Sequence, residues 1–369
     1  MNNRNTCDEK SLGRKNRRDT LIVIVIVLAM AGIAVLLAIL LNPGYTREPY
    51  QKEEYVLDTY VVISAYGKNQ AQVEEAVDAA FQELFRIEGI ADRYRPDSEM
   101  ARVNASAAGG PVVVSDELWE MIAAGMELYE ASGGLFDITV GPLVDVWDVV
   151  GRGERGDAPP SQEEIERALE LVGSDKLVLD EAAHSVYFSR EGMIVDLGGL
   201  AKGYALDRAE EVLRLRGIES GIIDTISTSL TFGDKPGSAG GPNWLLAVTN
   251  PREGEYLATF SFPGRNYLST SGDYQRYFEY DGVLYHHIID PRTGYPARGA
   301  IAVTVLGAKD GAWADAMSTA AFIMGYPDGL DWVEGVAGSE AIMVDPDGVV
   351  HITPGLEDSL SGLLESITP

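Results

Sequence analysis

An apolar segment near the N-terminus constrains this chain more than any other feature. Residues Leu21 to Leu41 form 21 consecutive positions without a charged or strongly polar side chain. A helix of that length can cross a hydrocarbon core of roughly 30 Å. The segment therefore predicts a single transmembrane helix, with the rest of the chain folding on one side of the membrane.

A cleaved signal peptide is the alternative interpretation of the same segment. Its apolar region would normally span about 7–15 residues and end at a small-x-small cleavage site. Here the run is longer and is followed by Asn42-Pro43-Gly44, which favours an uncleaved anchor. The single cysteine, Cys7, precedes the run, so it does not suit a lipid attachment site, and disulfides cannot stabilise the later residues.

The charges on either side of this segment differ in sign. Residues 1–20 contain six basic and three acidic side chains, a net charge of +3, which predicts a cytoplasmic location for this end. The remaining domain would then be extracytoplasmic, anchored to the cell membrane by one pass. Removing +3 from the chain total of −28 leaves −31 after the anchor, and so acidic a domain argues against binding nucleic acid.

The sequence predicts four regions. They are a basic segment at residues 1–20, a transmembrane helix at 21–41, a linker at 42–54 and one folded domain at 55–369. The linker is assigned from Pro43, Gly44, Pro49 and mixed charges. With 46% apolar residues, the chain has enough hydrophobic material for a proper core.

Hydrophobic periodicity and turn residues predict the secondary structure of the folded domain. Helices are expected at residues 71–91, 115–131, 161–171, 200–215 and 312–324. Strands are expected at residues 55–64, 176–180, 185–189, 220–226, 244–248, 256–262, 282–288 and 301–306, the second and third forming a hairpin. Because helices and strands do not alternate regularly, the predicted class is α+β, with mixed or antiparallel sheets flanked by helices.

Two side chains in the helix expected at 312–324 could share a cation. Asp315 and Thr319 are four residues apart, so they project from the same face about one turn from each other. An acid and a hydroxyl in this arrangement suit a hard cation such as Mg²⁺, which prefers oxygen ligands. The alternative is that both side chains bond to nearby backbone groups.

Two other motifs contain side chains that could bind a ligand or take part in catalysis. The run from Asp196 to Asp207 places two glycines before a helix and Lys202 in its first turn, an arrangement suited to an anionic ligand. An ordinary turn before a surface helix is the alternative. The run from Tyr285 to Pro296 contains His286 and His287; histidine can transfer protons near neutral pH, although a strand histidine can also simply bond to a neighbour.

These three motifs, together with Gly133–Thr139 and Asp92–Asn104, resemble the ApbE family of FAD:protein FMN transferases. The resemblance extends from about Leu57 to the region of Asp345. It implies a single large catalytic domain of the ApbE type, related to the T-fold. It also implies a magnesium-dependent transfer of FMN from FAD to a Thr or Ser hydroxyl of an acceptor flavoprotein, with release of AMP.

The resemblance further implies roles for individual residues. His287 would be the catalytic histidine that helps to deprotonate the acceptor hydroxyl. Magnesium would be held by Asp315, Thr319, Ser318 and the backbone carbonyl of Gly199. FAD would contact Leu57, Tyr94, Leu135, Phe136, Asp137, Asp196, Lys202 and Ile289. Tyr94 and Phe136 could equally be core residues.

One segment departs from the family pattern. Where the family has a Gly-Gly turn after the strand at 220–225, this chain has Ile226-Ser227-Thr228-Ser229, and side chains there could alter the nucleotide site or the acceptor channel. Two further functions therefore stay open. One is an FAD diphosphatase that releases FMN and AMP, and the other is a flavin-binding or scavenging protein without turnover.

Overall fold

The computed structural model describes residues 48–368, apart from 238–240, 242, 253–255 and 358. The basic segment at 1–20 and the membrane helix at 21–41 lie outside the described residues, and both remain predictions. Within the described part of the chain, no helix combines the length and the apolar character needed to cross a membrane.

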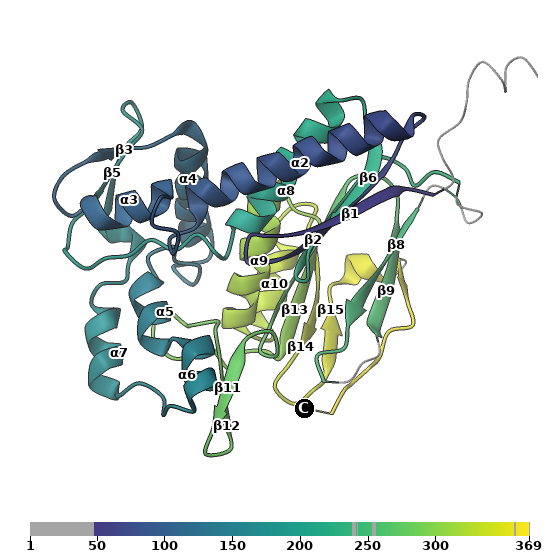
Figure 1. Cartoon of the computed structure of the whole chain (residues 1–369). Coiled ribbons are helices and arrows are strands. Elements are labelled where there is room, and N and C mark those ends of the chain that lie inside the picture. Colours follow the sequence, from purple (N-terminus) through teal and green to yellow (C-terminus); the bar gives the residue numbers. More distant parts are fainter. Residues whose placement is uncertain (1–47, 238–240, 242, 253–255, 358, 369) are drawn as a thin grey trace, which may run out of the picture. The chain divides into compact units, whose positions relative to one another are not determined.

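The described residues are organised around an eight-stranded sheet in which every neighbouring pair is antiparallel (Figure 1). The strands, in their order across the sheet, are β1 Tyr50–Val56, β2 Thr59–Tyr66, β6 Ser220–Asp224, β7 Thr228–Phe232, β10 Asn266–Gly272, β13 Ala302–Leu306, β14 Glu340–Val344 and β15 Val350–Ile352. The α+β class with mixed or antiparallel sheets, predicted from the sequence, is therefore confirmed, and this sheet is antiparallel.

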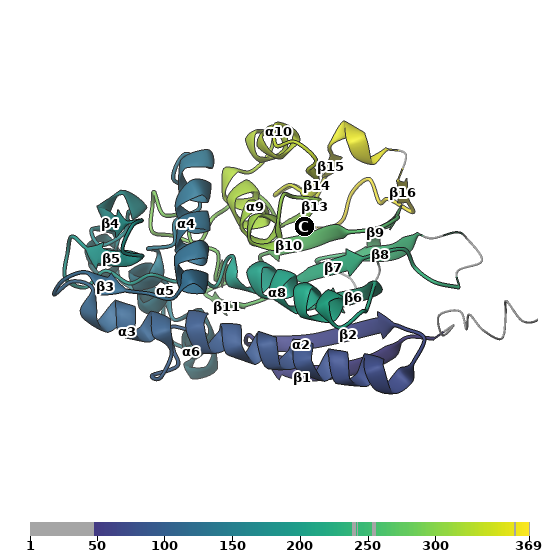
Figure 2. The same cartoon turned by 90° about the horizontal axis from the view of Figure 1, so that it is seen from above.

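Helices cover one face of this sheet, and a smaller sheet packs on part of the other (Figures 1 and 2). The helices are α2 Gln70–Ala91, α8 Ala201–Leu215, α9 Gly311–Met324 and α10 Asp328–Glu334. The smaller sheet consists of β8 Trp244–Thr249, β9 Tyr256–Phe262 and β16 Leu360–Ser361. Period-two alternation decides which side chains face which layer: in β13, Val303 and Val305 pack toward the helices, whereas Ala302 and Leu306 pack toward the smaller sheet.

The chain between α2 and α8 forms a separate group of short elements beside the central sheet (Figure 1). They are α3 Glu99–Ser106, β3 Val112–Val113, α4 Asp116–Ala131, α5 Gly141–Trp147, α6 Val149–Arg155, α7 Gln162–Leu169, a 3-10 turn Ser174–Lys176, β4 Leu177–Asp180 and β5 Ser185–Phe188. The hairpin of β11 Tyr277–Tyr280 and β12 Val283–His286 contributes Phe278 to the core of this group. A final 3-10 turn, Pro354–Leu356, follows β15.

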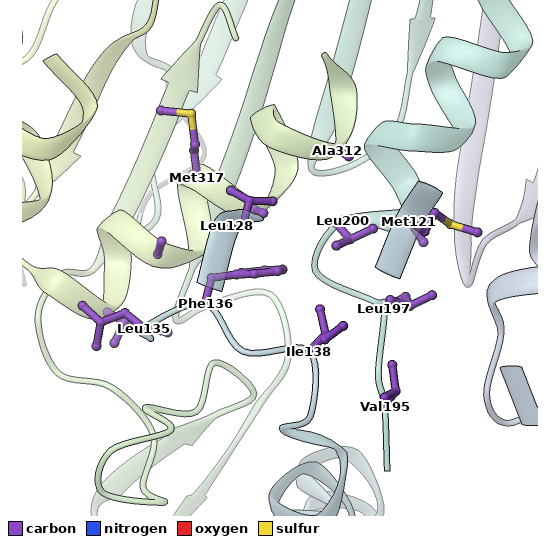
Figure 3. Packing of buried hydrophobic residues seen from close by; sticks show 14 of the residues in the cluster. Met121, Leu128, Leu135, Phe136, Ile138, Val195, Leu197, Leu200, Ala312 and Met317 are labelled. Carbon is purple, nitrogen blue, oxygen red and sulfur yellow. The ribbon is translucent and has the colours of Figure 1, made fainter. Parts of the chain in front are cut away.

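A continuous hydrophobic cluster joins this group to the central sheet. Phe136 and Leu135 lie in it with Leu128 of α4 and Met317 of α9 (Figure 3). The segment before α8 adds Leu197 and Leu200 from the other side (Figure 3). This packing fixes the loop at 133–139 and the start of α8 against α9, which positions the site described below.

Most predicted elements are present, but two expectations were wrong. All five predicted helices form, and the capping box at Ser161 and Glu164 starts α7 as expected. The strand expected at 55–64 is instead the β1–β2 hairpin, because Leu57 and Asp58 adopt left-handed φ values of 58° and 56° and reverse the chain. Consequently, residues 50–54, expected to be linker, are part of β1.

Candidate functional site

The site lies where the start of α8 packs against α9, next to β7 and β10. Two glycines make this meeting possible. A Cβ atom on Gly203 would lie 1.8 Å from the Gly311 carbonyl oxygen, and one on Gly311 would lie 2.1 Å from the Gly203 carbonyl oxygen. The backbones of the two helices therefore pack directly on each other. This close packing brings Lys202 Nζ within 3.5 Å of Asp315 Oδ2.

Asp315 is a buried carboxylate with donors on both oxygens. Its Oδ1 accepts from Thr228 Oγ1 at 3.0 Å and from Ser269 Oγ at 3.3 Å. Its Oδ2 accepts from the Gly203 amide at 3.3 Å and lies 3.5 Å from the Lys202 ammonium. Asp315 is only 5% exposed, and because a buried polar group without partners is costly, this set of donors offsets the cost of its burial.

Three hydroxyls lie on the neighbouring turn of α9 and on β10. Ser271 Oγ is 3.0 Å from Thr319 Oγ1 and 2.8 Å from Ser318 Oγ. Thr319 is half-buried. Among the described residues, Ser271 is the only side-chain hydrogen-bond partner of its hydroxyl. Ser318 Oγ also donates to the Asp315 carbonyl at 2.9 Å. Thr319 is consequently the more available of the two α9 hydroxyls.

The backbone before α8 leaves one carbonyl free. In a regular continuation of α8, the Gly203 amide would donate to the Gly199 carbonyl, but here it donates to Asp315. The Gly199 carbonyl oxygen therefore has no hydrogen-bond partner among the described residues.

These groups fit a hard cation. Across the residues described, no three His, Cys, Asp or Glu side chains cluster as a metal site, so a cation here would depend on Asp315 and neutral oxygens. One carboxylate with hydroxyl and carbonyl oxygens is a donor set suited to Mg²⁺, which retains waters and takes ligands from substrate phosphates. The site is thus compatible with a divalent cation that a diphosphate brings with it.

Asp196 is fixed by a residue that the sequence analysis did not select. Arg93 Nε donates to Asp196 Oδ2 at 2.6 Å and Arg93 Nη2 donates to Asp145 Oδ1 at 2.7 Å. The second oxygen of Asp196 accepts from the Gly198 amide at 2.8 Å. Tyr94 lies beside this ion pair with its ring 4.1 Å from the Arg93 guanidinium carbon, and it is 68% exposed. Tyr94 is therefore a surface ring rather than a core residue.

The two adjacent histidines have different surroundings. His286 is buried, with Nε2 donating to the Ala297 carbonyl at 2.7 Å and Nδ1 accepting from the Ile288 amide at 3.2 Å. His287 is half-buried and donates from Nδ1 to the Arg276 carbonyl at 3.3 Å. Because a carbonyl can only accept, this bond assigns the proton to Nδ1 and leaves Nε2 as a base without a partner among the described residues.

The surroundings of His287 disfavour the protonated form of its ring. Burial of the ring, and to a smaller extent the charges of Arg276, His286 and Lys202, lower the pKa of His287 to about 3. The Arg276 side chain also binds Asp58 at the tip of the β1–β2 hairpin, at 2.7 Å. This contact connects the loop that holds His287 to the first hairpin of the sheet.

Several residues predicted to contact FAD pack in the core or form hydrogen bonds within the protein. Leu135, Phe136 and Ile289 are buried apolar side chains. Asp137 accepts four hydrogen bonds, from the amides and hydroxyls of Thr139 and Ser174. These contacts account for the burial of Asp137 without a ligand. Leu57 occupies the β1–β2 turn, where its amide donates to Glu88 Oε1 at 2.7 Å.

Sequence reasoning missed the residues that surround Asp315 from the sheet. Thr228, Ser269 and Ser271 belong to β7 and β10, which the sequence analysis did not predict because hydroxyl side chains weaken the apolar alternation of both strands. One of them, Thr228, lies in the Ile226–Ser229 segment.

The turn at Ile226–Ser229 needs no glycine, because none of these residues has a positive φ. The Thr225 hydroxyl supports the turn by accepting from the Thr228 amide at 2.8 Å.

Comparison with known protein families supports the arrangement of motifs. The model of the ApbE family matches residues 57–343. An FAD:protein FMN transferase of Treponema pallidum is 31% identical over 321 residues, which cover 84% of this chain and 88% of that protein. An FAD:protein FMN transferase of Rhodobacter capsulatus is also 31% identical, over 84% of this chain and 58% of that protein.

Solved structures give the same result for the fold. The ApbE protein of Thermotoga maritima is similar with a TM-score of 0.77 and 31% identity, over 85% of this chain and 99% of that one. The flavinyl transferase ApbE of Pseudomonas stutzeri, in its apo form, is similar with a TM-score of 0.72 and 29% identity, over 85% of this chain and 96% of that one. The family match at residues 57–343 runs from the β1–β2 turn to beyond α9.

Proposed function

The chain belongs to the ApbE family, and on that premise we propose that it is an FAD:protein FMN transferase. The acceptor would be a flavoprotein that presents a Thr or Ser hydroxyl, and the second product would be AMP. The observation that carries this proposal is the Nε2 of His287, which has no partner among the described residues and whose ring feels the positive charge of Lys202 in the proposed anion-binding site. A protein that only stored flavin would have no need of such a base.

His287 would supply the proton transfer. Its Nδ1 proton is held by the Arg276 carbonyl, so Nε2 can accept the proton of the acceptor hydroxyl. The hydroxyl oxygen then forms a bond to the phosphorus on the FMN side of FAD. The diphosphate P–O bond breaks, and AMP departs with the bridging oxygen. FMN stays on the acceptor as a phosphoester.

Residues on α8 would orient the diphosphate. Lys202 lies in the first turn of α8, where its ammonium would attract an anionic group. Asp196, held by Arg93, would accept hydrogen bonds from the nucleotide. Tyr94 presents an exposed ring next to Asp196, which would offer a stacking surface to the flavin.

The donor set near Asp315 would hold magnesium. We assign this role to Asp315 and Thr319 with the Gly199 carbonyl, and Ser318 would take part only by exchanging its bond to the Asp315 carbonyl. When bound, the ion would neutralise charge on the phosphate oxygens during phosphoryl transfer. The free Gly199 carbonyl is the structural feature that supports this assignment.

A product analysis with the full-length protein in detergent tests the proposed activity. The protein is incubated with FAD, Mg²⁺ and a recombinant acceptor domain that a homologous FAD:protein FMN transferase modifies. We expect a covalent FMN adduct on the acceptor by mass spectrometry and an equal amount of AMP by chromatography. Free FMN with AMP and no adduct would identify a diphosphatase instead, and FAD that stays intact would identify a binding protein.

We also propose that residues 21–41 anchor the enzyme in the cell membrane, with the catalytic domain outside the cytoplasm. The support is the length of the apolar segment and the net charge of +3 before it. Alkaline extraction of membranes and protease treatment of spheroplasts test this arrangement. Release by alkali, or protection of the domain from the protease, would contradict it.

A further inference from the structure

A pair of hydroxyls on the central sheet lies directly beneath the Asp315 carboxylate. Thr228 begins β7, and Ser269 lies in the middle of β10. The two residues are opposite each other in the antiparallel register, and their hydroxyl oxygens are 3.0 Å apart. Both hydroxyls contact Asp315 Oδ1, Thr228 at 3.0 Å and Ser269 at 3.3 Å.

Both hydroxyls are fully buried, at 0% exposure for each residue. Water therefore cannot replace them as donors to Oδ1. A buried hydroxyl that donates to a carboxylate restricts the rotation of that carboxylate. With Oδ1 held by the sheet, the direction of Oδ2 is also determined, and Oδ2 faces the Gly203 amide and Lys202 on α8.

We propose that Thr228, assisted by Ser269, is a positioning residue for the metal-binding carboxylate of Asp315. This inference rests on the proposed function, because it takes Asp315 as a metal ligand. It also gives a role to the segment at Ile226–Ser229, where this chain has side chains in place of the Gly-Gly turn of the family pattern. At Thr228 the side chain points to the metal site, while Ile226 points to solvent with 74% exposure.

The alternative role for a buried threonine is to pack within the sheet, without affecting the metal site. In that case its hydroxyl would affect folding but not the affinity of the folded protein for a cation. Thr228→Val distinguishes the two roles, because it keeps the shape and removes the hydroxyl. Thr228→Ser keeps the hydroxyl and removes the methyl group, so the two variants separate hydrogen bonding from packing.

The experiment measures Mn²⁺ binding to the full-length protein in detergent, without FAD, from the EPR signal of free Mn²⁺. Circular dichroism at the same temperature shows that each variant is folded. Removing an outer partner of a metal ligand typically weakens metal binding about 10–100-fold, and we expect that loss for Thr228→Val. Thr228→Ser should stay within about threefold of the parent protein, because its hydroxyl is retained.

Thr270→Val is the matched control. Thr270 is the neighbour of Ser269 in β10, and its side chain points to the opposite face of the sheet, where its hydroxyl lies 2.8 Å from that of Thr304. Removing this hydroxyl should leave Mn²⁺ affinity unchanged. Equal weakening by Thr270→Val and Thr228→Val would overturn the proposal, because the effect would then reflect general loosening of the sheet.

Further outcomes separate this inference from the proposed metal site. Unchanged Mn²⁺ affinity in folded Thr228→Val, together with loss of binding in Asp315→Asn, would overturn the positioning role and leave the metal site in place. Retained binding in Asp315→Asn, or no binding by the parent protein, would overturn the metal assignment and this inference with it. If Thr228→Val does not fold, Ser269→Ala replaces it: weakened binding supports the proposal, and parent-like binding overturns it.

Discussion

His287 differs from His286 in having a ring nitrogen that no described group occupies. Replacing His287 by Ala should slow FMN transfer by about 10²–10⁴, the usual contribution of a positioned acid or base. FAD affinity should change by no more than a few-fold, because binding would depend on Lys202, Asp196 and the cation. Single-turnover rates and FAD titrations measure the two effects. His184→Ala is the control, since His184 stacks on Trp119, away from the site; transfer at the parent rate by His287→Ala would exclude the catalytic role.

His286 should affect stability and its dependence on pH. In the unfolded chain its pKa is near the ordinary value of 6.5, and in the folded chain burial lowers the pKa to about 4. Between these pH values the unfolded state binds more protons than the folded state. The contribution of neutral His286 to the free energy of unfolding is therefore fully present above pH 6.5 and is lost as the pH falls toward 4. His286→Gln removes this titration. The decrease in unfolding free energy between about pH 7 and pH 5, measured with urea, should therefore be smaller than in the parent.

The two carboxylate partners of Arg93 should contribute unequally to stability. The Arg93 side chain is 7% exposed, while Asp196 is 17% exposed and Asp145 is 44% exposed. Asp196→Ala leaves a buried guanidinium without its main partner and should cost about 3–5 kcal/mol. Asp145→Ala breaks a pair that water screens and should cost less than about 1 kcal/mol. Equal losses in urea unfolding would mean that burial does not control the strength of these pairs.

The contact between α8 and α9 depends on glycine, and it can be tested separately from the site residues. Gly311→Ala would place a Cβ atom 2.1 Å from the Gly203 carbonyl oxygen, so one helix must move. We expect a loss of about 1–3 kcal/mol and weaker Mn²⁺ binding, because Gly203 also donates to Asp315. Gly89→Ala in α2 meets nothing within 4 Å and should leave the stability unchanged or raise it by up to about 1 kcal/mol.

Helices were easier to predict from the sequence than strands, for physical reasons. The periodicity of α2 and the cap of α7 are local signals, and both elements have nearly the predicted bounds. By contrast, β7 and β10 are fully within the sheet and carry hydroxyls toward α9, so they lack an apolar alternation. The β1–β2 turn was missed because Leu57 and Asp58 adopt positive φ without the usual Asn-Gly or Asp-Gly signal.

In the site, too, residues in short sequence motifs were predicted, whereas their partners from distant parts of the chain were not. His287, Lys202 and Asp315 lie in short motifs that the sequence displays directly. Arg93 pairs with Asp196 across 103 positions, and Thr228 pairs with Asp315 across 87. Contacts of this kind depend on how the sheet is ordered, which no local pattern contains. The sequence could therefore name chemically active residues but not those that hold them in place.

The folded domain should be separable from the N-terminal segment. The sheet begins with β1 at Tyr50, and β1 pairs with β2 along its whole length, so a chain that begins at Arg47 retains every described strand. We expect this truncated protein to be soluble without detergent and to unfold in one cooperative transition. Calorimetry and size-exclusion chromatography measure both properties. Aggregation without a cooperative transition would show that the domain needs residues before Arg47.

The burial of α9 has a consequence for the motions of the molecule. Eleven of its fourteen residues are buried, including Asp315 and Ser318, because α9 packs against β10, β13 and the helices α4, α8 and α10. Amide hydrogens in such a helix exchange with solvent only when the whole domain opens. In hydrogen–deuterium exchange, α9 should therefore be among the last segments to take up deuterium, long after the exposed turn at Ile226. Any movement around the site would then come from the surrounding loops, while the helix that carries Asp315 stays fixed.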